Sequence, residues 1–299
     1  MHTTHIRKDK SQIVINAVTY VLVTIFCLMC ILPFWMIIAS SFSSEEGIRR
    51  TGFTLWPADK STFSYELLFR SPDQMIGAYI VTICLTAVGT LIGLFLISMT
   101  GYALQRKDFP YRNGIMFFIY FTSLFSAGLV PFYLLITQTL NLRDSYLAIL
   151  LPLLMSPWLI VLMKNFVKAI PHEITESGKI DGAGDFRIFY SLIMPNLKPA
   201  LATIGLFLAL SYWNEWYYSS LFLTTKVTYR PLQYHLYNVI NKVASLKNSV
   251  AGSNVVITDL PGETLKMATA VVATGPIILL YPFVQKYFVA GLTVGAVKG

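Results

Sequence analysis

The chain has 299 residues, of which 55% are apolar and 13% are charged, and its mean hydropathy is +0.60. A soluble domain of this size carries about a quarter charged residues, so this composition excludes an ordinary soluble protein and places the chain in a lipid bilayer. The formal net charge of +8 is scattered through short polar segments. It forms no basic stripe with interleaved aromatic residues, which argues against nucleic-acid binding and indicates membrane topology.

Six apolar segments are long enough to cross the ~30 Å hydrocarbon layer, which requires about 20 helical residues. A polar segment, 1–12, precedes them, and the first apolar run is too long for a signal-peptide core, so we expect it to be retained as a span. We predict an all-α membrane protein with a transmembrane domain at 13–299 and outer loops at 40–75 and 224–266. The six predicted spans are Ile13–Ile38, Ile76–Met99, Ile115–Ile136, Tyr146–Met163, Ala200–Leu223 and Met267–Phe288.

Basic residues give the expected orientation. An even number of spans puts both termini on one side of the membrane, and the excess of Lys and Arg on that side is small but has the sign expected for the cytoplasm. The local clusters agree: they are Arg7, Lys8 and Lys10 before the first span, and Arg106, Lys107 and Arg112 between the second and third. We therefore expect both termini to be cytoplasmic.

Cysteine and histidine residues provide no metal or redox site. Cys27 and Cys30 have CxxC spacing but lie inside an apolar run without a second pair of ligands, so they are interpreted as small apolar residues of a membrane helix. The four histidines are dispersed. Clustered ionisable residues at a membrane face, which a membrane-embedded enzyme needs, are also missing from the sequence pattern.

The second outer loop contains a predicted amphipathic helix. Pro231 suits the first turn of a helix, and four apolar residues follow it near helical spacing, namely Leu232, Leu236, Ile240 and Val243. The segment 248–254 is then rich in Asn, Ser and Gly, a composition typical of a flexible tip.

The stretch from Glu176 to Pro195 is polar, interrupted by glycine and flanked by apolar spans. Pro171 can begin a short helix that has Glu173 and Glu176 near its positive end. Asp181 to Gly184 should break this helix.

A second helix is expected after the glycine turn, capped by Asp185. Phe186, Phe189, Tyr190 and Ile193 follow helical spacing, so they predict a single apolar stripe. Pro195 and Pro199 should end this helix before the fifth span. Periodicity alone leaves two readings open, an ordinary helical loop and an element that docks a soluble partner.

The same stretch resembles the EAA loop of bacterial ABC importer permeases. Glu176-Ser177-Gly178 is followed after three residues by Gly182 and after nine more by Leu192-Ile193-Met194-Pro195. The resemblance extends over nearly the whole chain to the maltose-permease type of carbohydrate permease, in its MalG-like half and LplC/YtcP-like branch. Supporting motifs are Leu32-Pro33-Phe34-Trp35, Gly101-Tyr102-Ala103-Leu104, Gly128 to Tyr133, Trp213-Asn214-Glu215, Tyr281 to Phe288 and Gly295 to Gly299.

This resemblance implies a MetI-like permease fold, with the EAA loop at 164–199 and a cytoplasmic coupling helix between spans four and five. It implies transport of oligo- or polysaccharides through the bacterial cytoplasmic membrane, together with a MalF-like second permease, two ATP-binding subunits and an extracytoplasmic solute-binding protein. The residues implied to contact the ATPase are Glu176, Ser177, Gly178, Asp181, Gly182 and Ala183, with Pro195 completing the motif.

No phosphate-binding loop is recognisable in the sequence. Gly178-Lys179 is followed by Ile180 instead of Ser or Thr, and the required upstream glycine is missing. We therefore expect ATP and Mg²⁺ to be bound by partner subunits, with no cofactor in this chain.

The fifth predicted span contains an aromatic segment that is a candidate for the substrate path. Aromatic faces stack on sugars, and a charged residue within a span is a functional candidate. Glu215 lies ~22 Å along the span, at a depth where an aromatic belt or helix packing is favoured over sugar contact. The candidate residues are Tyr212, Trp213, Asn214, Glu215, Trp216 and Tyr217.

An ion-coupled secondary transporter is the main alternative function. Such a protein predicts paired ionisable residues at mid-span and an inverted repeat. The sequence has almost no acidic residues at mid-span and no recognisable repeat.

Overall fold

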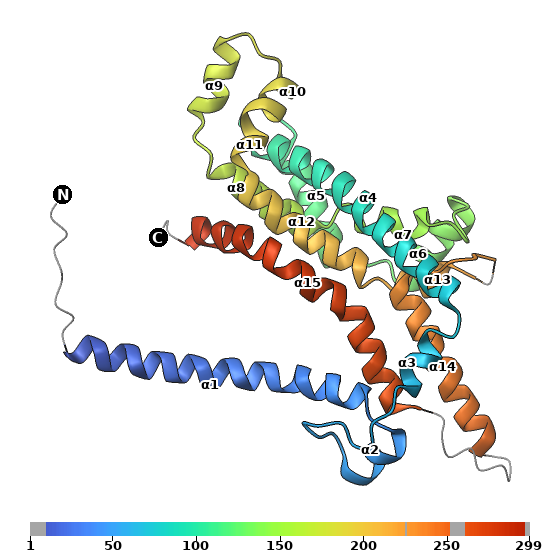
Figure 1. Cartoon of the computed structure of the whole chain (residues 1–299). Helices are drawn as coiled ribbons and strands as arrows, with labels where there is room; N and C mark the ends of the chain where they lie inside the picture. Colours follow the sequence, from blue (N-terminus) through green and yellow to red (C-terminus); the bar gives the residue numbers. More distant parts are fainter. Residues whose placement is uncertain (1–9, 225, 252–260, 297–299) are drawn as a thin grey trace. The chain divides into compact units, whose positions relative to one another are not determined.

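The computed structural model describes residues 10–224, 226–251 and 261–296, and over these ranges the chain is helical (Figure 1). The only β-type pairing among them is one isolated bridge between Ser43 and Lys60. Two compact units are present: residues 1–70 with 239–274, and residues 71–238 with 275–299. Helices α14 (Leu232–Ala251) and α15 (Glu263–Ala296) each contribute to both units.

The first unit contains α1 (Lys10–Ser41), α2 (Glu45–Thr51) and α3 (Phe63–Leu68). Its polar contacts centre on Glu45, whose carboxylate accepts hydrogen bonds from the backbone N–H groups of Gly262 at 2.8 Å and Thr264 at 3.2 Å. The carboxylate therefore satisfies free N–H groups at the start of α15.

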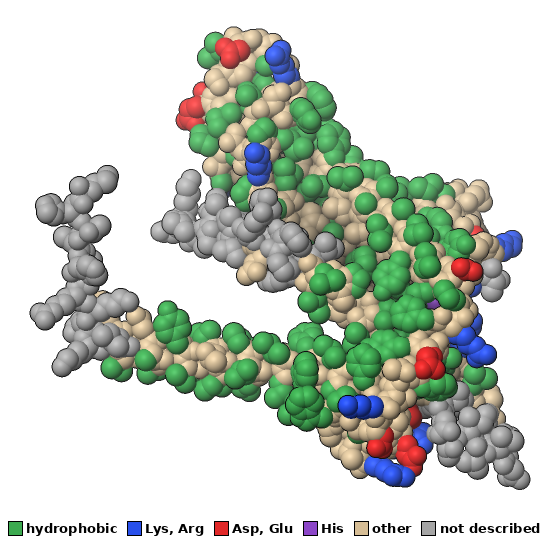
Figure 2. Space-filling model, viewed as in Figure 1, with side chains coloured by type: hydrophobic (Ala, Val, Ile, Leu, Met, Phe, Trp, Pro, Cys, Tyr) green, Lys and Arg blue, Asp and Glu red, His purple; other side chains and the backbone are tan. Residues whose placement is uncertain are grey.

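Helix α1 exposes apolar side chains on all sides. None of its most apolar window is buried, and Figure 2 shows its visible face covered by apolar side chains, while charged ones gather around α2. A helix that is apolar all round requires an apolar environment. An apolar environment must therefore cover α1.

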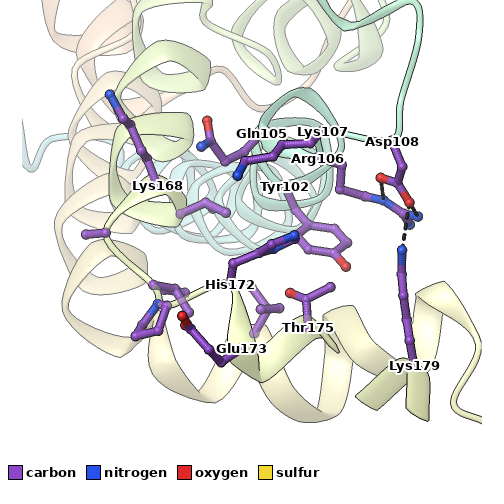
Figure 3. Close-up of a pocket in the computed structure, with 15 residues that line it drawn as sticks. Tyr102, Gln105, Arg106, Lys107, Asp108, Lys168, His172, Glu173, Thr175 and Lys179 are labelled. Atoms are coloured by element: carbon purple, nitrogen blue, oxygen red, sulfur yellow. Dashed lines mark hydrogen bonds and ion pairs between the residues drawn. The ribbon is translucent and has the colours of Figure 1, made fainter. Parts of the chain in front are cut away.

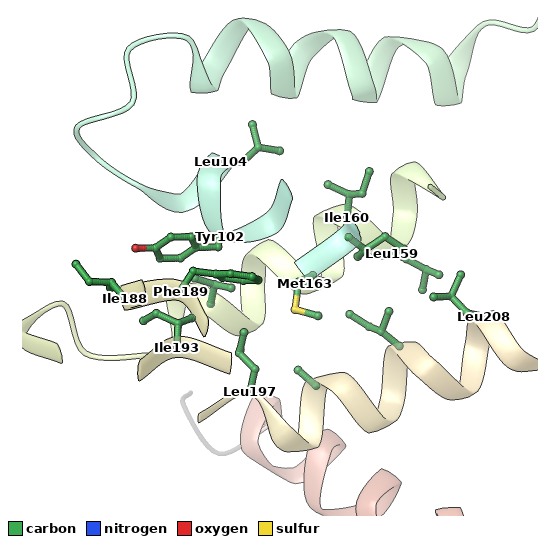
Figure 4. Close-up of a cluster of buried hydrophobic side chains, with 14 residues drawn as sticks. Tyr102, Leu104, Leu159, Ile160, Met163, Ile188, Phe189, Ile193, Leu197 and Leu208 are labelled. Atoms are coloured by element: carbon green, nitrogen blue, oxygen red, sulfur yellow. The ribbon is translucent and has the colours of Figure 1, made fainter. Parts of the chain in front are cut away.

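The second unit is built on α4 (Pro72–Gln105), which packs against α8 (Pro157–Lys168) and α12 (Lys198–Trp213). Its core includes the buried side chains of Ile97, Tyr102, Met163, Phe189 and Ile204 (Figure 4). This core reaches from the long helices into the polar loop between α8 and α12, so the loop is attached to the bundle by apolar packing.

Glycines on α4 allow this close approach. A Cβ on Gly89 would lie 2.3 Å from the Tyr212 ring, and one on Gly93 would lie 2.9 Å from the Leu154 carbonyl oxygen. The GxxxG step formed by these two glycines is therefore a helix contact surface.

The remaining helices of the second unit are short. They are α5 (Arg112–Leu124), α6 (Leu129–Leu134), the π-helix η1 (Leu135–Thr139), α7 (Leu147–Leu153), α9 (Glu173–Ile180), α10 (Asp185–Arg187), the π-helix η2 (Ile188–Ile193), α11 (Met194–Asn196) and α13 (Tyr217–Phe222).

Two single helices among the described residues, Val14–Ser41 and Pro72–Gln105, are long and apolar enough to cross a membrane. Three further candidates are pairs bent at short breaks by 114°, 44° and 86°. The third, fourth and fifth predicted spans are each divided into two helices, the fifth at residues 214–216 between α12 and α13. Gly128 at φ +89° occupies the break before α6, and Pro157 begins α8. The sixth predicted span lies within α15, where most side chains after 279 fall outside the described residues.

The predicted amphipathic helix of the second outer loop is confirmed as α14, which begins directly after Pro231 and buries Leu232, Leu236 and Val243. The predicted flexible tip at 248–254 is helical as far as Ala251. Its last three positions lie outside the described residues.

Candidate coupling loop and substrate path

The polar stretch between α8 and α12 contains the predicted short helix and glycine turn. Helix α9 has Glu173 and Glu176 in its first turn, where carboxylates stabilise the positive end of a helix. Gly182 has φ +74°, a conformation that glycine adopts without the penalty of a side chain. The turn is closed by the Ala183 N–H, which donates to the Gly178 carbonyl at 2.9 Å.

The second predicted helix differs from expectation in two respects. Asp185 does not cap it, because Gly184 occupies the cap position and the Asp185 carboxylate pairs with Arg106 at 2.6 Å. The predicted single stripe is also wrong: Phe189 and Ile193 are buried, whereas Phe186 and Tyr190 are exposed.

The cause of the second difference is the π-helix η2, which covers Ile188–Ile193. A π-turn hydrogen-bonds i to i+5, so it rotates the following residues relative to an α-helix. Ile188 therefore joins Phe189 and Ile193 in the core, and the predicted 3.6-residue pattern no longer applies.

The seven predicted coupling residues lie together on this loop but differ in exposure. Ala183 is half-buried and Gly178 is buried, while the other five are exposed, namely Glu176, Ser177, Asp181, Gly182 and Pro195. A Cβ on Gly178 would lie 2.7 Å from Cδ1 of Leu192. Gly178 thus faces the second helix, and its position corresponds to contact within the loop rather than to contact with a partner.

The sequence pattern did not predict that large apolar side chains form an exposed surface on this loop. Ile180 is 86% exposed, Phe186 62% and Tyr190 61%. Exposed charged residues are close to them along the chain, namely Lys179, Asp181, Asp185 and Arg187. Figure 2 shows charged and apolar side chains mixed on the end of the unit that carries α9. The available signal was Ile180, an apolar residue at the end of a helix that is otherwise polar.

An ion-pair network attaches this loop to the end of α4. Arg106 pairs with Asp108 at 2.5 Å and with Asp185 at 2.6 Å, and Lys179 pairs with Asp108 at 2.8 Å. Hydrogen bonds from Arg106 and then Lys179 hold the pKa of Asp108 well below its usual range. The sequence pattern did not predict this network, because Lys179 and Asp108 are 71 positions apart.

The predicted substrate-path residues separate into buried and exposed sets. Tyr212 and Trp213 are buried, and the Tyr212 hydroxyl donates to the Leu150 carbonyl at 2.8 Å. Glu215 is also buried: its carboxylate accepts hydrogen bonds from the Tyr218 N–H at 2.5 Å and the Ser219 hydroxyl at 2.5 Å. Tyr212 and Glu215 therefore have structural partners, and Glu215 caps α13.

Two residues of α14 contact exposed residues of the predicted substrate path. The Trp216 and Tyr237 rings lie 4.9 Å apart at 31°, and the Gln233 amide donates to the Asn214 side-chain oxygen at 3.4 Å. Asn214, Trp216, Tyr217 and Tyr237 are all exposed. We call Asn214, Trp216, Gln233 and Tyr237 the aromatic-amide surface. Its α14 members lie beyond the segment that the sequence singled out.

Apolar helices joined at one polar loop by a helix, a glycine turn and a second helix define a helical membrane protein. The chain belongs to the family of binding-protein-dependent transport system inner membrane components, whose sequence model matches residues 93–294. The permease subunits of this family are not themselves enzymes, because ATP hydrolysis resides in partner subunits.

Two relatives and one solved structure support this family assignment. The chain is 37% identical, over 94% of its length and 96% of the relative, to the polygalacturonan/rhamnogalacturonan transport system permease protein YtcP of Bacillus subtilis. It is 34% identical to the B. subtilis protein LplC, over 90% of each chain. A solved structure of a bacterial ABC transporter involved in the import of the acidic polysaccharide alginate contains a chain with 30% identity and a TM-score of 0.75, covering 94% of this chain and 99% of that one.

Proposed function

We propose that this chain forms half of the translocation pore of an ABC importer for oligo- or polysaccharides in the bacterial cytoplasmic membrane. The substrate class is supported by the names of the relatives, which transport polygalacturonan/rhamnogalacturonan or alginate. The proposed assembly contains a MalF-like second permease, two ATP-binding subunits that hold ATP and Mg²⁺, and an extracytoplasmic solute-binding protein. The chain crosses the membrane six times, with both termini in the cytoplasm.

The observation that carries the proposal is the exposed surface of the α9 loop. Glu176 and Asp181 supply carboxylates that can pair with basic residues of an ATPase. Ile180 and Phe186 supply apolar area beside them. Large exposed apolar side chains rimmed by charge are typical of protein interfaces, and this loop is polar enough to lie outside the bilayer.

The loop is built to transmit displacement. Gly178 packs on Leu192, and Lys179 and Asp185 are joined by ion pairs to Asp108 and Arg106 at the end of α4. When ATP closes the ATPase dimer, movement of α9 is passed to α4 and, through η2, to α12. The pore then opens outward to receive sugar from the binding protein, and hydrolysis returns it to the inward state.

The aromatic-amide surface is the proposed sugar contact in this subunit. The Trp216 and Tyr237 rings present apolar faces, and the Asn214 and Gln233 amides supply donors and acceptors for hydroxyl groups. This assignment reduces the proposed substrate path within the segment 212–217 to Asn214 and Trp216 and adds two residues of α14, Gln233 and Tyr237. The buried Tyr212, Trp213 and Glu215 position those members.

The test is uptake by proteoliposomes that contain the whole importer. Ile180→Asp and Glu176→Lys should leave the chain in the membrane but abolish substrate-stimulated ATP hydrolysis and uptake, because both changes disrupt docking of the ATPase. Lys198→Gln, an exposed change at the start of α12, is the control and should behave as wild type. Normal stimulation in both docking variants would refute the coupling role.

A further inference from the structure

The second unit contains a cavity of about 520 Å³ beside the α9 loop (Figure 3). It is lined by the end of α4, the turn after it, the end of α8 and the start of α9, including Tyr102, Lys107, Lys168 and His172. Its volume lies in the range of about 300–1,000 Å³ that is usual for small-ligand sites. The loop's proposed contacts with an ATPase are on other residues.

Tyr102 has an unsatisfied polar atom at this cavity. The residue is 6% exposed, and its buried hydroxyl has no hydrogen-bond partner among the described residues. Buried hydroxyl groups without partners are uncommon and costly. Figure 3 shows Tyr102 beside His172 and Thr175 in the lining, between Lys168 on one side and the Asp108–Lys179 ion pair on the other. Within the part of the chain that the structure describes, the hydroxyl therefore lacks a hydrogen-bond partner at the wall of the cavity.

The cavity also has an excess of positive charge. Arg106 and Lys179 are paired with carboxylates. Lys107 and Lys168 line the same cavity and, within the described residues, form no ion pair. Glu173 is the only lining carboxylate besides Asp108. Lys107 and Lys168 thus supply two ammonium groups without an ion-pair partner in the described part of the chain, and Glu173 offsets only one of these charges. With the unpartnered hydroxyl, they match an oxyanion with several acceptors, such as a phosphate group.

The position of the cavity identifies the source of the phosphate. Helix α4 ends at Gln105 and α8 ends at Lys168, so the cavity lies where two apolar segments leave the bilayer. Basic pockets between membrane helices at this depth bind the head groups of anionic lipids. We infer that the cavity binds the phosphate head group of an anionic phospholipid, held by Lys107, Lys168 and the Tyr102 hydroxyl.

The experiment is a lipid titration of the intact importer in detergent. Short-chain phosphatidylglycerol is added, and retained lipid is counted by native mass spectrometry. Tyr102→Phe should weaken retention about threefold or more and Lys107→Gln/Lys168→Gln about tenfold or more, because bonds to charged groups are lost. Lys198→Gln, which removes a lysine outside the cavity, should match wild type. Tyr102→Phe preserves the buried ring, so a folding defect does not obscure its result.

Further ligands distinguish the possible sources of the anion. Phosphatidylcholine has the phosphate but no net charge and should bind at least about fivefold more weakly. Inorganic phosphate should compete only at concentrations far above those of the lipid. Equal retention of phosphatidylglycerol by wild type and all cavity variants would overturn the site, and phosphate binding without any preference for the lipid would overturn the lipid assignment. Assembly with the ATPase, measured in parallel, separates either failure from a failure of the proposed function.

Discussion

At the scale of single residues, Gly182 allows the backbone turn of the loop after α9. Its φ of +74° lies in the left-handed region, and no atom lies within 4 Å of a Cβ built there. A side chain would therefore be strained by the backbone alone, by about 1–2 kcal/mol. The strain would act at the turn that connects α9 to the second helix.

Gly182→Ala should reduce substrate-stimulated ATP hydrolysis about five- to tenfold, because the turn relieves its strain by leaving the docked geometry. Membrane insertion should be unchanged. Gly184→Ala is the matched control: this glycine has φ −67° and equally open surroundings. An equal loss in both variants would show that side-chain bulk, and not backbone conformation, is responsible.

The position of Glu215 in an apolar segment suggests a role in function, but its hydrogen bonds indicate a structural role as a cap of α13. A charged residue in a span is a functional candidate by default, yet this carboxylate is bonded to the N-terminal turn of α13. Glu215→Ala should lower the free energy of unfolding by about 1–3 kcal/mol, because N–H groups lose their acceptor. Thermal denaturation of the detergent-solubilised complex measures this, and Asn214→Ala should shift the midpoint less. An unchanged midpoint for Glu215→Ala would contradict the capping role.

These two residues show which parts of a site a sequence can predict. The Gly182 turn is local, and glycine between two polar helices is sufficient to predict it. The capping role of Glu215 depends on the break between α12 and α13, and the apolar composition of the segment does not reveal this break. Its hydrogen-bonding partners are three and four positions away, but they are available only because the chain starts a new helix there.

At the scale of elements, we expect the ion pairs between α4 and the loop to matter more for the proposed coupling than for stability. The Arg106 side chain is 19% exposed and that of Asp185 is 62% exposed, and such pairs contribute about 0.2–1 kcal/mol. Arg106→Gln should therefore change the thermal midpoint little while lowering substrate-stimulated hydrolysis several-fold. A double-mutant cycle with Asp185→Asn tests this: additive losses of stimulated hydrolysis would contradict a shared pathway.

The same network should be insensitive to pH in the physiological range. The pKa of Asp108 is lowered in the folded protein, so its stabilising contribution is complete above its ordinary pKa of about 3.9 and is lost only as the pH falls through the lowered value. ATPase coupling should show no dependence on this group between about pH 5 and 8. Asp108→Asn should reduce coupling by the same factor at both ends of that range, as measured by stimulated hydrolysis. A loss of stimulated hydrolysis confined to one end of this pH range would contradict the lowered pKa assigned to Asp108.

The aromatic-amide surface joins two elements that the sequence treats separately. Trp216→Ala and Tyr237→Ala should each raise the KM for uptake about tenfold, since each removes a stacking face worth about 1–2 kcal/mol. The basal ATPase rate should be unaffected. Tyr120→Ala, which removes another exposed aromatic ring on α5, serves as the control and should leave KM unchanged. Unaltered KM in both surface variants would reassign the ring pair to packing.

At the scale of the whole molecule, energy should come only from ATP. Uptake into proteoliposomes should cease when the ATP-binding subunits are omitted and should persist when ionophores dissipate ion gradients. An ion-coupled transporter gives the opposite pattern, so this single comparison separates the proposed function from its main alternative.

Membrane character, helical class and the glycine turn after α9 could all be predicted from composition and spacing. The breaks in the third and fourth predicted spans could not, because glycine and proline are also tolerated in continuous membrane helices. The break in the fifth predicted span has no glycine or proline to indicate it. The π-helix η2 could not be predicted either. The sequence satisfies α-helical spacing at Phe186, Phe189, Tyr190 and Ile193, and only packing against the core determines which of these side chains are buried.

The contact between Gly89 and Tyr212 has a consequence for the evolution of such permeases. The Tyr212 ring occupies the space of the missing side chain at position 89, and its hydroxyl is fixed by Leu150. Neither position can change alone without a clash or a void. Natural variants with a larger residue at 89 should therefore have a smaller one at 212, so the two positions are expected to covary among homologues although 123 positions separate them along the chain.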